Sequence, residues 1–89
     1  MARMNMAELD NMQNAMLDGG ADSLYQLGLK YSAGKGVDTD LVSAHKWFNL
    51  AAMRGNREAR DYRTELAREM SVNDVAEAQR QAREWLRCH

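Results

Sequence analysis

Two parts of the sequence carry residues that act as proton carriers or metal ligands in other proteins. His45 could exchange a proton near neutral pH, but a single histidine beside Trp47 in a helical segment is typical of a half-exposed surface residue. Cys88 and His89 are adjacent potential zinc ligands, whereas zinc usually takes four ligands with loop or helix spacing. The sequence therefore predicts no metal site, and an intermolecular disulfide on oxidation is the better interpretation of the cysteine.

The remaining candidates for catalysis have a structural explanation. The GKG stretch at 34–36 suggests phosphate binding, but it lacks the Walker spacing and a preceding strand, so a turn between two helices explains it better. Asp38 with Asp40, and Glu65 with Glu69, have the pattern of solvated faces and do not indicate acid–base catalysis. No serine triad order, nucleophile elbow or HExxH motif is present. We therefore expect no catalytic residues, no cofactor and no enzymatic activity.

Length and charge restrict the class of protein further. The chain has 89 residues with 12 basic and 13 acidic side chains, which is enough for one small domain, residues 1–89. The near-zero net charge argues against a dedicated nucleic-acid binder. No apolar run approaches the roughly 18–20 residues that cross a bilayer, and the polar first ten residues lack the apolar region of a secretory signal. With a single cysteine, these features predict a soluble, cytoplasmic protein that binds neither nucleic acid nor membranes.

The elements that would position these side chains are all predicted to be helices. The sequence has no proline, no isoleucine and few other strand-forming residues, while Ala, Leu, Met, Glu, Gln and Arg are abundant. Apolar residues at helical spacing, together with glycine stops and capping signals, predict five helices at about 4–17, 21–33, 40–54, 57–69 and 71–87. The short connections predict antiparallel neighbours, in a chain of helical hairpins stacked side by side.

Local signals refine these elements. Thr39 or Asp40 could cap the third helix, and Ser71 with an acid three residues later resembles the capping box of the fifth helix. Gly28 lies within the second helix, where glycine costs about 1 kcal/mol relative to alanine. We therefore expect a neighbouring helix to approach Gly28 closely, with Trp47 or a residue next to it filling the space. The two glycines of the 34–36 turn are expected to adopt positive φ or a tight turn.

Residues 21–56 carry an ordered set of motifs. An LGxxY stretch comes first, then GxGVxxD, then AxxWFxxAAxxG. Their order and spacing closely resemble one Sel1-like repeat, a relative of the tetratricopeptide repeat. The resemblance assigns a structural role to Leu27, Gly28, Tyr31, Gly34, Gly36, Val37, Asp40, Ala44, Trp47, Phe48, Ala51, Ala52 and Gly55.

The resemblance implies both a fold and a function. It predicts an all-α fold of five antiparallel helices in a short α-solenoid: an N-terminal capping helix (1–20), the repeat (21–56), and a degenerate half-repeat with a C-terminal capping helix (57–89). Proteins with this repeat commonly act as adaptors or scaffolds, so a non-catalytic protein–protein interaction module is expected. In such stacks the first helix of each hairpin lines the concave side. A protein or peptide partner is therefore expected to contact Asp22, Gln26, Leu29, Lys30, Arg57, Arg60, Asp61 and Thr64.

Two further features leave alternatives open. Stacked repeats usually need about three units for stability, and five of the seven methionines lie in the first 16 residues. These observations predict a self-associating structural or regulatory subunit, a homo-oligomer, as the second hypothesis. In addition, arginines recur every three residues from 54 to 63 with acids between them. That pattern is either a salt-bridged solvent face or a patch for an acidic partner.

Overall fold

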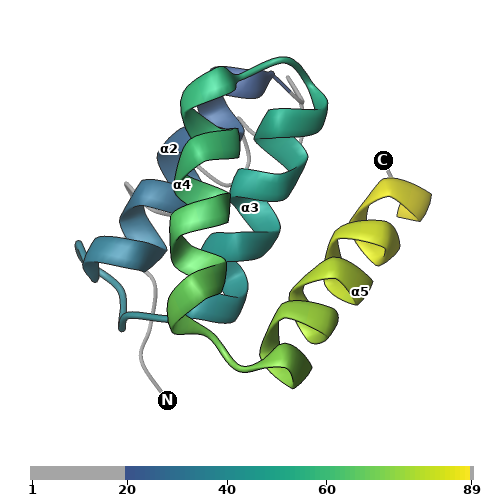
Figure 1. The fold of residues 1–89 in the computed structure, drawn as a ribbon. Helices are drawn as coiled ribbons and strands as arrows, with labels where there is room; N and C mark the ends of the chain where they lie inside the picture. The colour runs from purple at the N-terminus through teal and green to yellow at the C-terminus, as the bar shows by residue number, and fades with distance from the viewer. Residues whose placement is uncertain (1–19, 89) are drawn as a thin grey trace.

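The computed structural model describes residues 20–88, and this part of the chain forms four α-helices and no strand. They are α2 (Ala21–Ala33), α3 (Leu41–Met53), α4 (Arg57–Glu69) and α5 (Val72–Cys88) (Figure 1). Each begins and ends close to its predicted bounds. The helix predicted at 4–17 lies outside the described residues, so the structure shows four helices where five were predicted. The all-helical class is confirmed for the described part of the chain.

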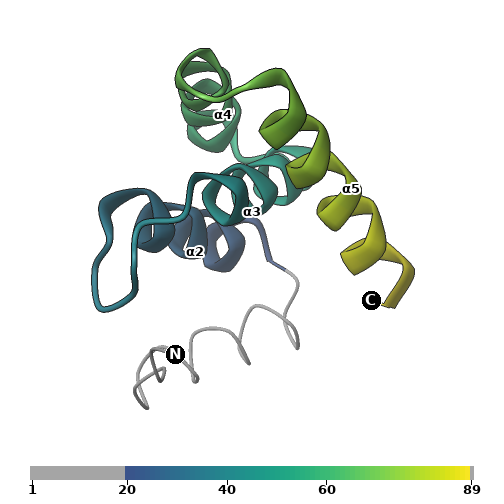
Figure 2. The ribbon, with the colours of Figure 1, turned by 90° about the horizontal axis from the view of Figure 1, so that it is seen from below.

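Helix α3 lies at the centre, and the other three helices surround it (Figure 2). The main helix–helix contacts are those of α3 with α2, with α4 and with α5. Helices α2 and α4 run antiparallel to α3, while α5 returns in the general direction of α3 at an angle to it (Figure 1). The chain therefore forms two successive hairpins, α2–α3 and α4–α5, that share α3 as their packing centre.

The central place of α3 follows from its side chains, which are apolar around most of the helix. Leu50 and Ala51 are completely buried, and Trp47 is almost so. Trp47 meets Trp85 of α5 edge to face, with ring centroids 6.0 Å apart and planes at 84°. All four described helices contribute to one continuous core, whose buried residues are Leu24, Leu27, Ala44, Trp47, Phe48, Leu50, Ala51, Ala59, Leu66, Ala82 and Trp85.

The close approach predicted at Gly28 is confirmed, with a different partner from the first choice. A Cβ atom added to Gly28 would collide with Cδ1 and Cε1 of the Phe48 ring and would lie 2.9 Å from its Cγ. Phe48, the residue next to Trp47, therefore fills this space, while Trp47 faces α5. Glycine is needed at position 28 because a side chain there would push α3 away from α2.

The helix ends use the capping signals in the sequence. Asp40, Asn56 and Ser71 each accept a hydrogen bond from the backbone N–H three residues further on, at 3.1, 2.7 and 3.0 Å respectively. Asp40 rather than Thr39 thus caps α3, and Asn56 is a cap of α4 that the sequence analysis did not identify. Gly34 and Gly36 have φ of 69° and 76°, which confirms the left-handed turn between α2 and α3.

Candidate partner-binding surfaces

Helices α2 and α4 lie beside each other and run in the same direction, so their exposed residues form one surface. Near the start of both helices, Asn56 Nδ2 donates a hydrogen bond to Asp22 Oδ1 at 3.4 Å. One turn further along, the rings of Tyr25 and Tyr62 are 6.0 Å apart. We call the exposed residues on the adjoining sides of these two helices, which include Tyr62, Glu65 and Glu69, the α2/α4 face. These two helices are the ones that the family resemblance predicted to line a concave side.

An aromatic cluster forms the middle of this face. Tyr62 stacks on the buried ring of Phe48, with centroids 5.4 Å apart and planes at 16°, and Tyr25 lies 6.0 Å from Phe48. The side chain of Tyr62 is nevertheless 48% exposed. A tyrosine that is fixed on one side and open to solvent on the other has the properties of an interface anchor.

Acidic side chains border this cluster. Glu65 and Glu69 line a shallow pocket of about 250 Å³ together with Tyr62 and with Ser32 of α2. Burial raises the pKa of Tyr25, and its hydrogen bond with Glu58 raises it further. The side of α4 that faces α2 therefore carries three acidic side chains at helical spacing, Glu58, Glu65 and Glu69, of which Glu65 also pairs with Arg68 at 3.0 Å.

The structure distributes the eight predicted contact residues over more than one surface. On α2, Asp22 and Gln26 are exposed, while Leu29 and Lys30 are half-buried. On α4, all four predicted residues are exposed, namely Arg57, Arg60, Asp61 and Thr64.

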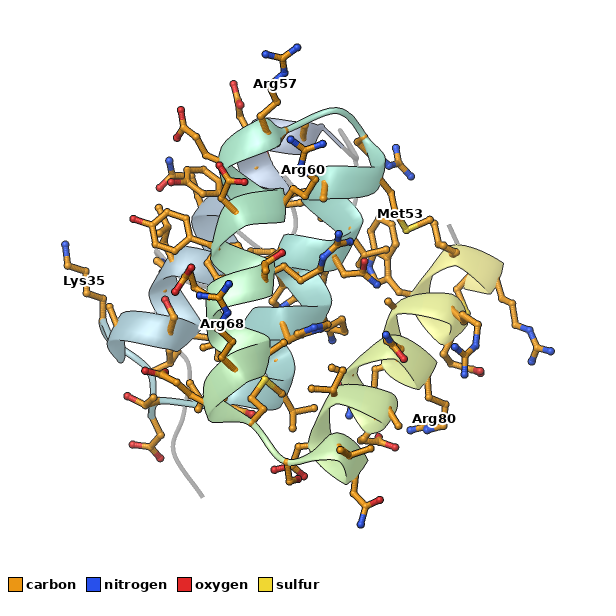
Figure 3. The ribbon with its side chains drawn as sticks, viewed as in Figure 1. Lys35, Met53, Arg57, Arg60, Arg68 and Arg80 are labelled. Atoms are coloured by element: carbon orange, nitrogen blue, oxygen red, sulfur yellow. The ribbon has the colours of Figure 1, made fainter. Side chains whose placement is uncertain are left out.

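The two arginines of the α4 group line a shallow pocket of about 200 Å³ at the α3–α4 turn, together with Ala52, Gly55 and Asn56. Figure 3 shows Arg57 and Arg60 in the first half of α4. Thr64 lines a different pocket, which α5 helps to form. Arg57 and Arg60 therefore do not lie in the acidic pocket beside Tyr62.

The third surface lies where α4 and α5 meet α3. His45 lines a pocket there and is only 3% exposed, so the expectation of a half-exposed surface histidine is wrong. Burial lowers the pKa of His45, and the positive charge of Arg63 lowers it further. The sequence spacing indicates this burial, because His45 follows Leu41 by four residues and precedes Phe48 by three, on the buried side of α3.

The arginines at 54–63 do not form a single stripe. The Arg54 guanidinium lies over the Trp85 ring, 5.7 Å from its centroid, and Arg63 donates a hydrogen bond to Asn49 Oδ1 at 2.7 Å. Ion pairs in residues 20–88 instead join side chains one turn apart on the same helix: Arg68–Glu65, Arg80–Glu77 and Arg87–Glu84. The arginines of this series therefore lie in at least two separate environments.

Comparisons with known proteins agree with the motifs. Residues 21–56 match the family model of the Sel1 repeat, which is the segment where the sequence motifs lie and which forms α2, α3 and their connection. This segment of the chain is therefore a Sel1-like repeat. No curated protein and no solved structure matched the chain.

Among residues 20–88, no helix is long and apolar enough to cross a membrane. Cys88 is exposed, and His89 lies outside the described residues. Within the described part of the chain, no three His, Cys, Asp or Glu side chains are grouped so that they could hold a metal ion.

Proposed function

We propose that this chain is a non-catalytic adaptor or scaffold that holds a protein or peptide partner against the α2/α4 face. Sel1 repeats generally mediate protein–protein interactions and are typically non-catalytic. The observation that carries the proposal is Tyr62, which is 48% exposed while it stacks on the buried Phe48. Exposed aromatic side chains with a rigid support are the positions where interfaces concentrate their binding energy.

The charges around Tyr62 define the partner. Glu65 and Glu69 line the pocket beside the tyrosine, so a complementary segment has an apolar side chain over Tyr62 and basic side chains beside it. Two neighbouring helices favour a helix or an extended peptide laid along them. Of the eight predicted contact residues, Asp22 and Gln26 extend this surface along α2, where both are exposed.

Charge and shape variants test the proposal. Proteins retained by the immobilised wild-type chain are compared with those retained by Tyr62→Ala, by Glu65→Lys and by the triple variant Lys30→Glu/Arg57→Glu/Arg60→Glu, the last of which tests the predicted contact residues. Arg83→Glu on the exposed side of α5 is the matched control.

The proposal predicts at least one protein that wild type and the Arg83 variant retain and that Tyr62→Ala and Glu65→Lys lose. Retention of the same proteins by all variants contradicts it. A protein lost only from the triple variant assigns binding to the arginine-lined pocket at the α3–α4 turn instead.

Self-association is the second candidate function, favoured by exposed apolar side chains at the ends of the bundle. Met53 is 60% and Val72 is 85% exposed, and Figure 3 shows Met53 close to the far end of α5. Light scattering over a concentration range tests this candidate. A mass that stays near 10.1 kDa at high micromolar concentration excludes it. A cytoplasmic location stays a prediction.

A further inference from the structure

A separate pocket lies on the other side of α4, in the angle between α4 and α5. It exists because both helices pack mainly on α3 (Figure 1). The pocket has a volume of about 430 Å³ and receives side chains from all three helices: His45, Asn49, Arg63, Thr64, Ala67, Val75 and Gln79. Five of these seven side chains are polar, and none of them is acidic.

Arg63 supplies the positive charge of the pocket. Its Nη1 donates a hydrogen bond to Asn49 Oδ1 at 2.7 Å, which fixes the guanidinium at the wall between α3 and α4. The guanidinium has five N–H donors in a planar fork, so donors remain beyond the one that this bond uses. Since no acidic side chain lines the pocket, its lining residues leave the charge of Arg63 uncompensated.

His45 is a buried polar side chain in the same pocket. It is 97% buried, being 3% exposed, and its Nδ1 has no hydrogen-bond partner among the described residues. Buried polar groups of this kind are rare, because an unmade hydrogen bond costs free energy. A buried histidine nitrogen without a partner, in the same pocket as Arg63, therefore indicates a place that a ligand completes.

We propose that this pocket binds a carboxylate group, carried by an acidic side chain or by the C-terminus of a partner chain. The Arg63 fork matches the two oxygens of a carboxylate, and the amide groups of Asn49 and Gln79 can donate further hydrogen bonds. Ala67 and Val75 form the apolar part of the wall, which suits the methylene groups next to the carboxylate.

The proposal does not depend on the one made for the α2/α4 face. Of the eight predicted contact residues, Thr64 alone lines this pocket. The pocket is also basic, whereas the pocket beside Tyr62 is bordered by Glu65 and Glu69. The two surfaces therefore select for opposite charges, and the loss of one site leaves the other intact.

Nuclear magnetic resonance of the full ¹⁵N-labelled chain tests the pocket with small probes. The probes are N-acetylglutamate α-amide for a side-chain carboxylate, N-acetylalanine for a terminal carboxylate and inorganic phosphate, with sodium chloride at equal ionic strength as the reference. We expect saturable shifts of the His45 ring nitrogens and of Arg63 Nε–H with at least one carboxylate. The carboxylate that binds more tightly shows whether a side chain or a C-terminus is the natural ligand. Shifts no larger than those in sodium chloride, or tighter binding of phosphate, overturn the proposal.

Paired variants make the test specific. Arg63→Gln is expected to weaken carboxylate binding roughly tenfold or more, because it removes the charged fork. Arg83→Gln removes the same charge from an exposed position on α5 outside the pocket, and it is expected to leave the affinity unchanged. If Arg63→Gln loses the dispersed amide spectrum of a folded protein, Gln79→Ala at an exposed position of α5 replaces it as the pocket variant. Equal losses in the pocket and control variants overturn the proposal.

Discussion

Replacing Gly28 by alanine should destabilise the protein, although alanine is the better helix former. Within a helix the change from glycine to alanine gains about 1 kcal/mol. The new Cβ would collide with the Phe48 ring and lie 2.9 Å from its Cγ, and such overpacking costs about 1–3 kcal/mol. The ring cannot easily turn away, because it stacks on Tyr62 at 5.4 Å. The net expectation is a loss of about 1 kcal/mol.

A double-mutant cycle with Phe48→Leu separates the two contributions. Leucine is flexible and lacks the ring atoms that Cβ would meet, so Gly28→Ala in that background should recover most of its helix propensity gain. The assay is thermal unfolding followed by circular dichroism, supported by urea titration. In the wild-type background Tm should fall by roughly 4–8 °C per kcal/mol lost, whereas in the Phe48→Leu background it should rise.

The coupling energy between the two positions decides the interpretation. We expect a value of about 1–3 kcal/mol, in the range found for residues in direct contact. Phe48→Leu destabilises the protein by itself, and the cycle subtracts that effect. If Gly28→Ala raises Tm equally in both backgrounds, Phe48 does not restrict position 28 and the packing argument is refuted.

Three further predictions concern single groups. Because burial lowers the pKa of His45 below 6.5, the unfolded state binds more protons below about pH 6.5 and stability should fall there; urea midpoints should show this loss in wild type and a smaller one in His45→Gln. The hydrogen bond from Arg80 lowers the pKa of Glu77 from 4.5 to about 2, so its contribution is present above pH 4.5 and lost between 4.5 and 2; the difference in Tm between wild type and Glu77→Gln should vanish over that range, and a constant difference would contradict it. Asn56→Ala should cost about 1 kcal/mol by uncapping α4, measured by urea titration against Asn73→Ala, an exposed control that should change little.

Much of the fold follows from local signals in the sequence. The spacing of apolar residues places the last four helices, and Asp40 and Ser71 cap α3 and α5 as their positions predict. Gly28 inside a helix predicts a close helix approach, which the structure confirms with Phe48. These features depend on neighbours within a turn of helix or within one hairpin. The helices, their caps and their close contact can therefore be predicted from the sequence.

The candidate surfaces depend on contacts between segments distant in sequence. Tyr62 is half exposed because Phe48 supports one side of its ring, and nothing in α4 alone reveals that support. Likewise, the pocket of His45 and Arg63 depends on how α4 and α5 diverge over α3. Sequence spacing separates the buried side of each helix from its exposed side, but it cannot distinguish the side of α4 that faces α2 from the side that faces α5.

Site-specific photo-crosslinking in the cells that produce the protein tests most directly whether a partner is held on the α2/α4 face. A photoreactive phenylalanine analogue replaces Tyr62. In a control chain the same analogue replaces Arg83, at an exposed position of α5. We expect one or a few defined proteins to be cross-linked from position 62 and not from position 83. Identical products from both positions, or none from position 62 while position 83 cross-links, would contradict it.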